Sequence, residues 1–218
     1  MKDIKKAKKV QFSSGTIKRL SLYLRKLKTI QDNNVNVISS SAITQLLNVT
    51  PAQFRKDLSY FGGFGKRGVG YNVSLLIKEI EDILGINQEW KIALVGTGKL
   101  GSALLGFEGF SKFNLKITCA FDNQKNKIGE NIGNIKIIDI KNLEKIIKKQ
   151  NIKMAIIATP PEVAQNMASQ LVKAGIKGIM NFAPVFITVN KNVVVSNIDM
   201  ASELENLVFF VKRGELKT

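Results

Sequence analysis

The sequence contains no histidine and a single cysteine, Cys119, among its 218 residues. Histidine is the commonest general base and the commonest metal ligand, so any catalytic site here has to work without it. One cysteine can form no disulfide within the chain, and without partner cysteines it cannot build a thiolate zinc site. We therefore expect no metal and no disulfide framework, and a reducing, cytoplasmic location.

Long hydrophobic runs are also missing. No apolar stretch approaches the roughly 20 residues of a membrane-spanning helix. The basic segment of residues 1–10 is not followed by the apolar stretch of a secretory signal. With 44% hydrophobic residues and a mean hydropathy of +0.02, the composition predicts a soluble globular protein of one large or two small domains with no membrane partner.

Acidic residues are scarce in the first third of the chain. Residues 1–70 contain 14 lysines and arginines but 3 acids, a net charge of +11 out of +16 for the whole chain. Any one of these lysines is most simply explained as part of a solvated surface. A basic block confined to one end, however, more often marks a polyanionic partner such as nucleic acid.

Helical patterns occupy this basic block. Apolar residues recur at three- and four-residue spacings from 17 to 30, which predicts an amphipathic helix with a basic outer face. Serines 39–41 offer an N-cap for a short second helix. Thr50 and Gln53 form the pattern of a capping box, and Pro51 occupies the first helical position of a third helix. Its residues Phe54, Leu58 and Phe61 are expected to point inward.

The second and third of these helices are joined by a short turn, which is typical of a helix-turn-helix. The second helix of such a motif, here the predicted helix that begins at Pro51, enters the major groove of DNA with its polar side chains. The helical residues that we expect at the DNA are Ser40, Ser41, Gln53, Arg55, Lys56, Ser59 and Tyr60.

Two stretches share the spacing G-x-G-x-x-G, which is weak evidence for a dinucleotide site on its own. The stretch with Gly96, Gly98 and Gly101 follows the strand-like "KIALV" and opens a helix, so that helix amides can face a pyrophosphate. Asp122 ends the next predicted strand, about 20 residues on, where an acid accepts a hydrogen bond from the ribose. This order favours NAD(H) over NADP(H), an inference that nearby Lys125 and Lys127 weaken; the alternative is a tight turn that needs glycine for packing.

The other stretch, "FGGFGKRGVGY", has Gly63, Gly65 and Gly68 but fails the same test, because a basic helix precedes it and no suitable acid follows. One interpretation is a flexible linker between domains. The interpretation that we prefer is a β-hairpin, the wing of a winged helix, with Lys66 and Arg67 at its tip. Glycine keeps such a tip thin, and two cations can then reach phosphates or a narrow minor groove.

The remainder of the chain alternates strand-like and helical segments, which predicts a parallel sheet covered on both faces. The fold class is therefore α/β: a winged-helix domain at residues 1–85, a Rossmann-like domain at residues 86–200, and an apolar C-terminal helix at residues 201–218.

No catalytic group accompanies the predicted nicotinamide fold. The three tyrosines all precede it, none has a lysine four residues on, and no lysine or acid is convincingly placed as a partner. Thr159, Pro160 and the segment 181–184 lie at predicted strand ends, where ligands bind in such sheets, although ordinary loop chemistry also explains them. Three hypotheses remain: a DNA-binding NADH sensor, a small oxidoreductase with a basic surface, and a nucleotide-binding domain fused to an RNA-binding or docking module.

Long strings of residues go beyond these patterns: "RKDLSYFG", "KRGVGY", "LVGTGKLGSAL", "AFD", "AGIKGIMNFAPV" and "NIDMASEL". With them nearly the whole chain resembles the Rex family of redox-sensing transcriptional repressors. The resemblance implies no enzymatic activity but a homodimer that binds a palindromic operator at a low NADH/NAD⁺ ratio and releases it when NADH binds. It also implies that the apolar C-terminal helix is swapped between subunits; the alternative is packing on its own sheet.

The resemblance also implies roles for residues. Arg55, Lys56, Lys66 and Arg67 are expected at the DNA, and Arg19, Phe107 and Asp199 at a switch, where Phe107 occupies a position that is tyrosine in the family. That departure puts a hydrogen-bonded switch in doubt. An apolar pocket near Phe107, Ala183 and Pro184 would disfavour the cationic nicotinamide. The expected cofactor contacts are Gly96, Thr97, Gly98, Lys99, Leu100, Gly101, Phe107, Asp122, Lys127, Thr159, Pro160, Asn181, Ala183 and Pro184.

Overall fold

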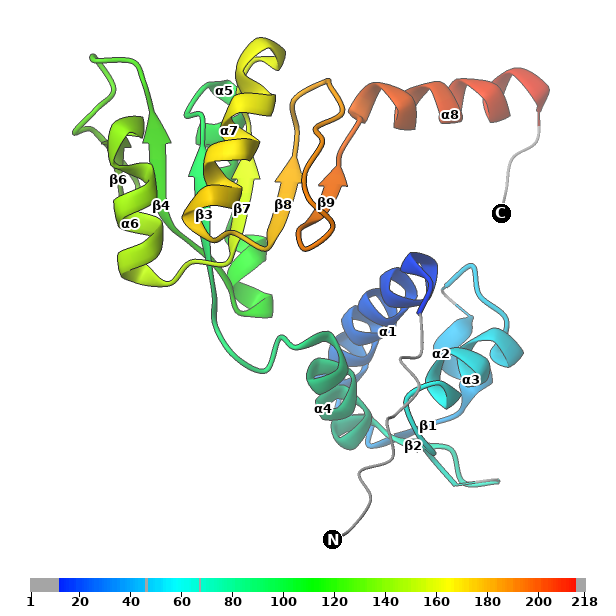
Figure 1. Ribbon diagram of the computed structural model, residues 1–218. Coiled ribbons are helices and arrows are strands. Elements are labelled where there is room, and N and C mark those ends of the chain that lie inside the picture. The colour runs from blue at the N-terminus through cyan, green and yellow to red at the C-terminus, as the bar shows by residue number, and fades with distance from the viewer. Residues whose placement is uncertain (1–11, 46, 67, 215–218) are drawn as a thin grey trace, which may run out of the picture. The chain divides into compact units, whose positions relative to one another are not determined.

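The computed structural model describes residues 12–45, 47–66 and 68–214 of the chain. Figure 1 shows its two compact units, residues 1–88 and 89–218. The division falls three residues beyond the predicted boundary after residue 85, and the C-terminal helix is grouped with the second unit. Each unit is described by itself below.

The first unit is a small helical domain with a two-stranded sheet. Its elements are α1 (Ser14–Asp32), β1 (Val37–Ile38), α2 (Ser40–Thr44), α3 (Pro51–Ser59), β2 (Tyr71–Asn72) and α4 (Val73–Leu84). Local sequence sets the helix ends: the Ser39 hydroxyl accepts from the Ala42 amide, the Thr50 hydroxyl accepts from the Gln53 amide, and Gly85 ends α4 in the left-handed conformation.

The apolar faces of these helices meet in one core. Tyr23 of α1 and Phe54 of α3 are both fully buried and pack edge to face at 4.8 Å. Phe61, which we expected in this core, is half-buried and stacks on Phe12 instead. The further buried apolar residues are Leu20, Leu24, Leu27, Ile43, Leu58, Val73, Leu76, Ile77 and Ile80.

The strand β1 lies in a stretch that the sequence suggests is a polar loop. It pairs antiparallel with β2, with Val37 opposite Asn72 and Ile38 opposite Tyr71. The pairing carries the chain away from α3 and back, so the glycine-rich stretch between α3 and β2 forms a hairpin anchored on β1 rather than a linker.

The second unit is built on a seven-stranded sheet with the order β5-β6-β4-β3-β7-β8-β9. Its strands are β3 (Trp90–Val95), β4 (Leu115–Asp122), β5 (Asn131–Ile132), β6 (Ile135–Asp139), β7 (Met154–Ile157), β8 (Gly178–Asn181) and β9 (Val194–Asn197). All neighbours are parallel except β5 and β6. In the segment 185–199, β9 is the one strand.

Helices cover both faces of this sheet, as Figure 1 shows. They are α5 (Lys99–Leu105), η1 (Glu108–Phe113), η2 (Ile140–Asn142), α6 (Leu143–Gln150) and α7 (Pro161–Ala174). Alternation along β3 separates the two layers: Ala93 and Val95 belong to the core under α6 and α7, whereas Ile92 and Leu94 pack with side chains of α5 and η1. Cys119 lies in the first of these cores and is 2% exposed.

The last helix, α8 (Met200–Arg213), leaves the sheet after β9 and contributes no buried residue. Its apolar side chains Leu204, Leu207, Val208 and Val211 are 63, 59, 64 and 70% exposed. Their spacing places them on one face of the helix, so this unit offers them no core. Among the described residues, no helix is long and apolar enough to cross a membrane.

Candidate functional site

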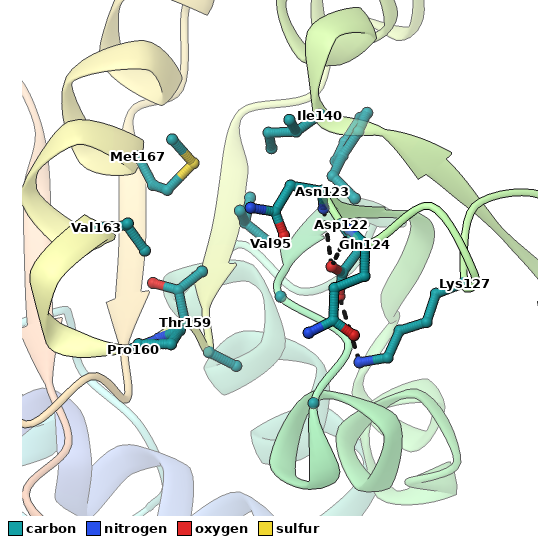
Figure 2. A pocket seen from close by; sticks show the side chains of 14 residues that line it. Val95, Asp122, Asn123, Gln124, Lys127, Ile140, Thr159, Pro160, Val163 and Met167 are labelled. Carbon is teal, nitrogen blue, oxygen red and sulfur yellow. Dashed lines mark hydrogen bonds and ion pairs between the residues drawn. The ribbon is translucent and has the colours of Figure 1, made fainter.

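A cleft of about 410 Å³ opens at the carboxyl ends of β3, β4 and β7 (Figure 2). Strand β3 comes first along the chain among the strands of this sheet, but it lies in the middle of the sheet, with β4 on one side and β7 on the other. This is the point where the strand order reverses, and α/β sheets bind their ligands there. The lining residues are Val95, Gly96, Gly98, Phe121, Asp122, Asn123, Gln124, Lys127, Ile140, Ala158, Thr159, Pro160, Val163 and Met167.

In the loop between β3 and α5, each of the three positions is occupied by glycine for a different physical reason. Gly96 has a φ of +93°, and a Cβ there would lie 2.5 Å from the carbonyl oxygen of Ala158. A Cβ on Gly101 would clash with the carbonyl oxygen of Gly96, so α5 can approach the strand only with glycine at that position. At Gly98 a Cβ would meet nothing within 4 Å. Gly98 therefore leaves open space at the amino end of α5, where a pyrophosphate binds in such folds.

Asp122 ends β4 beside this loop, but its carboxylate is turned toward the protein. Oδ2 accepts hydrogen bonds from the amide and the hydroxyl of Thr97, at 2.8 and 2.5 Å, and Oδ1 accepts from the amides of Asn123 and Gln124. Lys127 Nζ lies 3.8 Å from Oδ2. Burial by itself would raise the pKa of Asp122, but these hydrogen bonds and the lysine outweigh it and lower the pKa. Asp122 thus ties the glycine loop to β4.

Thr159, on the opposite side of the cleft, follows β7. Its Oγ1 is buried yet forms no hydrogen bond within the described part of the chain. Buried hydroxyls normally have a partner, so this atom is available to a polar group of a ligand. Beside it Pro160 precedes α7 and also lines the cleft. Of the other predicted contacts in the loop, Thr97 is buried, whereas Lys99 and Leu100 lie in the first turn of α5.

Asn181, one of the predicted cofactor contacts, is hydrogen-bonded within the chain at the end of β8. It is 0% exposed. Its Nδ2 donates to the carbonyl oxygens of Ala183 and Val185 and to Oδ1 of Asn197, and its own Oδ1 accepts from the Ala183 amide. These hydrogen bonds join the end of β8 to β9, and the contact of Asn181 with a cofactor stays a prediction.

The residues of the predicted apolar pocket for the nicotinamide, Phe107, Ala183 and Pro184, do not line the main cleft. Ala183 and Pro184 line a small hollow of about 50 Å³ together with Asp199. The Asp199 carboxylate caps α8 by accepting from the amides of Ala201 and Ser202. Phe107 lies in neither lining; it precedes η1, is 56% exposed and packs edge to face on Phe110 at 4.9 Å.

A groove of about 720 Å³ lies in the first unit between the helix-turn-helix and the wing. It brings Ser40 of α2, Arg55 of α3 and Lys66 of the wing to one surface, where Arg55 Nη1 donates to Ser40 Oγ at 2.9 Å. The described residues of its lining include two cations and no acid. Such a surface fits a phosphate backbone.

The wing is closed by paired hydrogen bonds between the backbones of Lys66 and Gly70, both 3.1 Å. A Cβ on Gly65 or Gly70 would lie 2.9 or 2.6 Å from a carbonyl oxygen, and both glycines have positive φ, so the narrow hairpin requires them. Lys66 is thereby exposed beside the tip. Arg67, predicted to share this role, lies outside the described residues.

The other predicted DNA contacts divide into two groups. Ser41, Lys56, Ser59 and Tyr60 are exposed, in agreement with a surface role, although the Ser59 hydroxyl donates to the Lys56 carbonyl oxygen of its own helix. Gln53 differs, because its side-chain amide donates to Asp57 Oδ1 at 2.8 Å. Among the described residues Gln53 forms no reciprocal hydrogen bond with the Thr50 amide, and its contact with DNA stays a prediction.

Asp57 is the centre of a network that the sequence analysis missed. It is 0% exposed and accepts from Arg19 Nε and Nη2, both at 2.6 Å, and from the Tyr23 hydroxyl at 2.8 Å, as well as from Gln53. The Arg19 guanidinium, predicted to take part in a switch, is thus already paired within its own unit. One signal was available: Asp57 lies three residues after the inward-pointing Phe54, on the inner face of α3.

Burial and pairing act in opposite directions on these groups. Burial alone would raise the pKa of Asp57, but the hydrogen bonds from Arg19, Tyr23 and Gln53 outweigh it and lower the pKa. Burial, and then the bond to Asp57, raise the pKa of Tyr23. The bond to Asp57 also raises the pKa of Arg19. At neutral pH this part of the first unit therefore contains a charged pair that ties α3 to α1.

Both units of the chain match families of known proteins. Residues 12–59 match the family model of a putative DNA-binding protein N-terminus, and residues 87–185 match that of a CoA binding domain. A redox-sensing transcriptional repressor Rex from Carboxydothermus hydrogenoformans is 44% identical over 199 residues, 91% of this chain and 96% of the relative. The chain belongs to the Rex family of redox-sensing transcriptional repressors. Rex from Brevibacillus brevis is 41% identical over 94% of this chain and 99% of its own.

Solved Rex structures agree with the fold of the whole chain. A crystal structure of RSP in complex with beta-NAD⁺ and operator DNA has a TM-score of 0.90 and 33% identity, with 95% of this chain and 96% of that chain covered. The structure of RSP in complex with beta-NADH has a TM-score of 0.85 and 32% identity, covering 95 and 98%. The α/β fold with an N-terminal DNA-binding domain is thus confirmed, and the Rex relatives are named as regulators rather than enzymes.

Proposed function

We propose that this Rex-family chain is a repressor that binds operator DNA when the NADH/NAD⁺ ratio is low and releases it when NADH occupies the cleft of the second unit. The observation that carries the proposal is that one chain combines a fingerprint loop open at Gly98 with a basic groove between α2, α3 and the wing. The RSP complexes with beta-NAD⁺ and operator DNA and with beta-NADH support it.

On this proposal different groups of the chain bind different parts of the cofactor. The amides at the start of α5, beside Gly98, would hold the pyrophosphate, and the free hydroxyl of Thr159 would bind a polar group further along the cleft. The bound nicotinamide is neutral when reduced and cationic when oxidised. NADH and DNA oppose each other's binding. By linkage, bound NADH must weaken DNA binding by the same coupling free energy as bound DNA weakens NADH binding, typically about 1–3 kcal/mol.

The proposal includes a homodimer and a cytoplasmic location. The apolar stripe of α8 supports the dimer, because in a single subunit it remains exposed. A twofold dimer recognises half-sites related by the same symmetry, roughly one helical turn or a multiple of it apart. Exchange of α8 between subunits is the arrangement that we propose.

The decisive experiment selects a sequence from random duplexes and then measures its affinity by fluorescence anisotropy with saturating NADH, NAD⁺ or no dinucleotide. We expect a sequence-specific, salt-sensitive complex that NADH dissolves and NAD⁺ largely spares. Specific binding that saturating NADH leaves unchanged would refute the sensor. Substrate-dependent NADH oxidation would favour an oxidoreductase, and the absence of any sequence preference would favour a different nucleic-acid or protein partner.

Two variants separate the surfaces. Asp122→Ala should weaken NADH binding, because it frees the glycine loop, and should leave DNA binding without cofactor unchanged. Lys66→Ala with Arg67→Ala should weaken DNA binding and leave NADH binding unchanged. The slope of log affinity against log salt concentration should decrease by roughly 1 for each lysine or arginine that contacts a phosphate. Lys78→Ala, an exposed lysine of α4 outside the groove, is the control for charge alone. If the wing variant keeps both its DNA affinity and its salt slope, the wing is misassigned.

A further inference from the structure

The amino edge of the seven-stranded sheet carries lysines at one level of four neighbouring strands, β4, β3, β7 and β8. Lys91 of β3 lies opposite Lys116 of β4 in the parallel register. The pairing of β3 with β7, carried one residue back, places Lys91 beside Lys153. The Lys177 amide, directly before β8, donates to the Lys153 carbonyl oxygen at 2.8 Å. We call these four residues the lysine row.

The side chains of the lysine row leave the same face of the sheet. Residues two apart along a strand point to the same side, and so do residues opposite each other on neighbouring strands. Ala93, two residues after Lys91, belongs to the core under α6 and α7, and the same holds two residues after Lys153 and Lys177. At the edge of this core the side chains reach solvent: Lys91, Lys116 and Lys177 are exposed and Lys153 is half-buried.

Few acids offset this charge. Lys116 Nζ lies 3.8 Å from Glu89, whereas Lys91, Lys153 and Lys177 form no ion pair within the described part of the chain. The last turns of α6 and α7, which lead into β7 and β8, add Lys148, Lys149 and Lys173, of which Lys148 and Lys173 lie 2.6 and 3.8 Å from Glu144. Like charges directly opposite each other destabilise a sheet, so the fold itself does not require the row.

The geometry of the row indicates the kind of partner. Neighbouring strands lie about 4.8 Å apart, so the four lysines form a line of positive charge that spans roughly 14 Å at the backbone. Duplex DNA also presents its charge along a line, with about one negative charge for each 1.7 Å of its axis. A linear array of cations fits such a linear polyanion better than it fits the flat charge of a membrane surface.

We propose that the lysine row is a second DNA-binding surface of this chain, which contacts the phosphate backbone of duplex DNA outside the operator without reading its sequence. This DNA either flanks the operator or belongs to a separate duplex, and the chemistry of the contact is the same. Where it flanks the operator, the second contact forms at high effective concentration and strengthens the complex. The inference rests on the proposed function, since it assumes that the first unit binds operator DNA.

The test measures the affinity of the full chain for two duplexes that carry the selected operator, one of about 25 base pairs and one of about 80, at several salt concentrations. Lys91→Gln with Lys153→Gln and Lys177→Gln should bind the short duplex as the unmodified chain does, and should bind the long one about tenfold or more weakly. On the long duplex its slope of log affinity against log salt concentration should decrease by roughly 1 for each lysine that contacts a phosphate.

A second measurement distinguishes the two sources of DNA. A fluorescent duplex of unrelated sequence is added to the chain saturated with the short operator. Capture of this duplex by the unmodified chain but not by the row variant indicates a separate duplex, whereas a loss confined to the long operator duplex indicates flanking DNA. Either result supports the inference. A row variant that matches the unmodified chain in both measurements overturns it.

Lys125→Gln with Lys136→Gln and Lys145→Gln is the matched control, because these three lysines are exposed on the same unit and lie outside the row. It should bind both duplexes as the unmodified chain does; an equal loss in the control would attribute the effect to net charge and overturn the inference.

The row variant should also keep its NADH affinity, because the cleft lies at the opposite, carboxyl edge of the sheet. This measurement shows that its second unit is folded. If the unmodified chain binds the short operator specifically and the row variant shows no loss, the proposed function stands and the inference alone fails. If the unmodified chain does not bind the short operator, both fail.

Discussion

Asp57 and Asp122 are buried acids that hold distant segments together, one in each unit. Asp57 accepts four hydrogen bonds from α1 and α3, and Asp122 accepts four from its own strand end and from Thr97. A buried charge is tolerated only when its partners compensate for the lost hydration. These two carboxylates therefore make the geometry of α3 and of the glycine loop depend on single side chains.

Neutralising Asp57 should destabilise the first unit. In Asp57→Asn the Arg19 guanidinium loses its ionic partner, and the new side-chain amide nitrogen faces hydrogen-bond donors. We expect the unfolding free energy to fall by about 2 kcal/mol. The loss is smaller than for a fully buried pair because the Arg19 side chain is 28% exposed. Hydrogen exchange of peptides from α1 and α3, with increasing denaturant, measures the change. Asp32→Asn is the control, because Asp32 is exposed at the end of α1; equal losses in both variants would contradict the role of the network.

The same pair predicts a pH dependence. The pKa of Asp57 is lowered in the folded chain from its ordinary value near 3.8, so its stabilisation is present above that value and disappears as the pH falls through the folded pKa. The difference in unfolding free energy between the unmodified chain and Asp57→Asn should be constant from about pH 5 to 8 and shrink below about pH 4. A difference that grows on acidification would show that the carboxylate is not stabilised by its partners.

Sequence predicts where such residues lie better than what they contact. The order of strand, glycines, helix and acid predicts Asp122 at the edge of the cleft, where the structure has it. Its partner Thr97 is 25 residues away, and no local pattern shows that the acid faces the loop. Asn181 and Arg19 illustrate the same limit, since their hydrogen bonds join segments that only the folded chain brings together.

At the scale of elements, the features with local causes were predicted and those with distant causes were not. Thr50 and Pro51 mark a helix start that depends on a few neighbouring residues, and α3 begins there. The two-residue strand β1 depends on pairing with β2, more than 30 residues later. Short strands of this kind have no periodicity of their own, and for this reason the anchoring of the wing could not be predicted.

The fingerprint loop gives a test that separates folding from binding. Gly98→Ala should leave the thermal stability of the second unit almost unchanged, because a Cβ there meets no atom within 4 Å and the φ of −66° suits alanine. It should weaken NADH binding about tenfold or more, because the methyl group would occupy the space at the amino end of α5.

Calorimetry for stability and titration for affinity would measure the two effects. Gly106→Ala is the matched control: its Cβ would make an ordinary contact of 3.7 Å, and Gly106 lies outside the cleft lining. Gly101→Ala, by contrast, should disrupt folding. If Gly98→Ala binds NADH as the unmodified chain does, the pyrophosphate does not lie at this loop.

At the scale of the whole molecule, α8 is the element that a single subunit does not explain. Leu204, Leu207, Val208 and Val211 form an apolar stripe on a helix without a buried residue. Exposed stripes of this kind mark interfaces. The composition of residues 200–214 predicts an apolar helix, but only the structure shows that its own sheet does not cover it.

Two charges on this stripe should dissociate the proposed dimer. We expect Leu207→Glu with Val211→Glu to be monomeric by size-exclusion chromatography with light scattering, and to bind a two-half-site operator at least about tenfold more weakly, because the second half-site is no longer held at high effective concentration. Ser202→Glu with Asn206→Glu adds the same charge to the opposite face of α8 and should remain dimeric. A dimeric stripe variant would place the interface elsewhere.

The burial of Cys119 makes this thiol a reporter of how often the second unit opens. Burial raises its pKa to about 12, so almost no reactive thiolate exists at neutral pH, and a thiol reagent should label the chain only through transient opening of the core under α6 and α7. A ligand that binds the closed form slows such labelling by the factor 1 + [L]/Kd, about 100-fold at 100 times Kd. Timed labelling therefore measures dinucleotide occupancy without DNA, and it should rank NADH and NAD⁺ in the same order as direct titration.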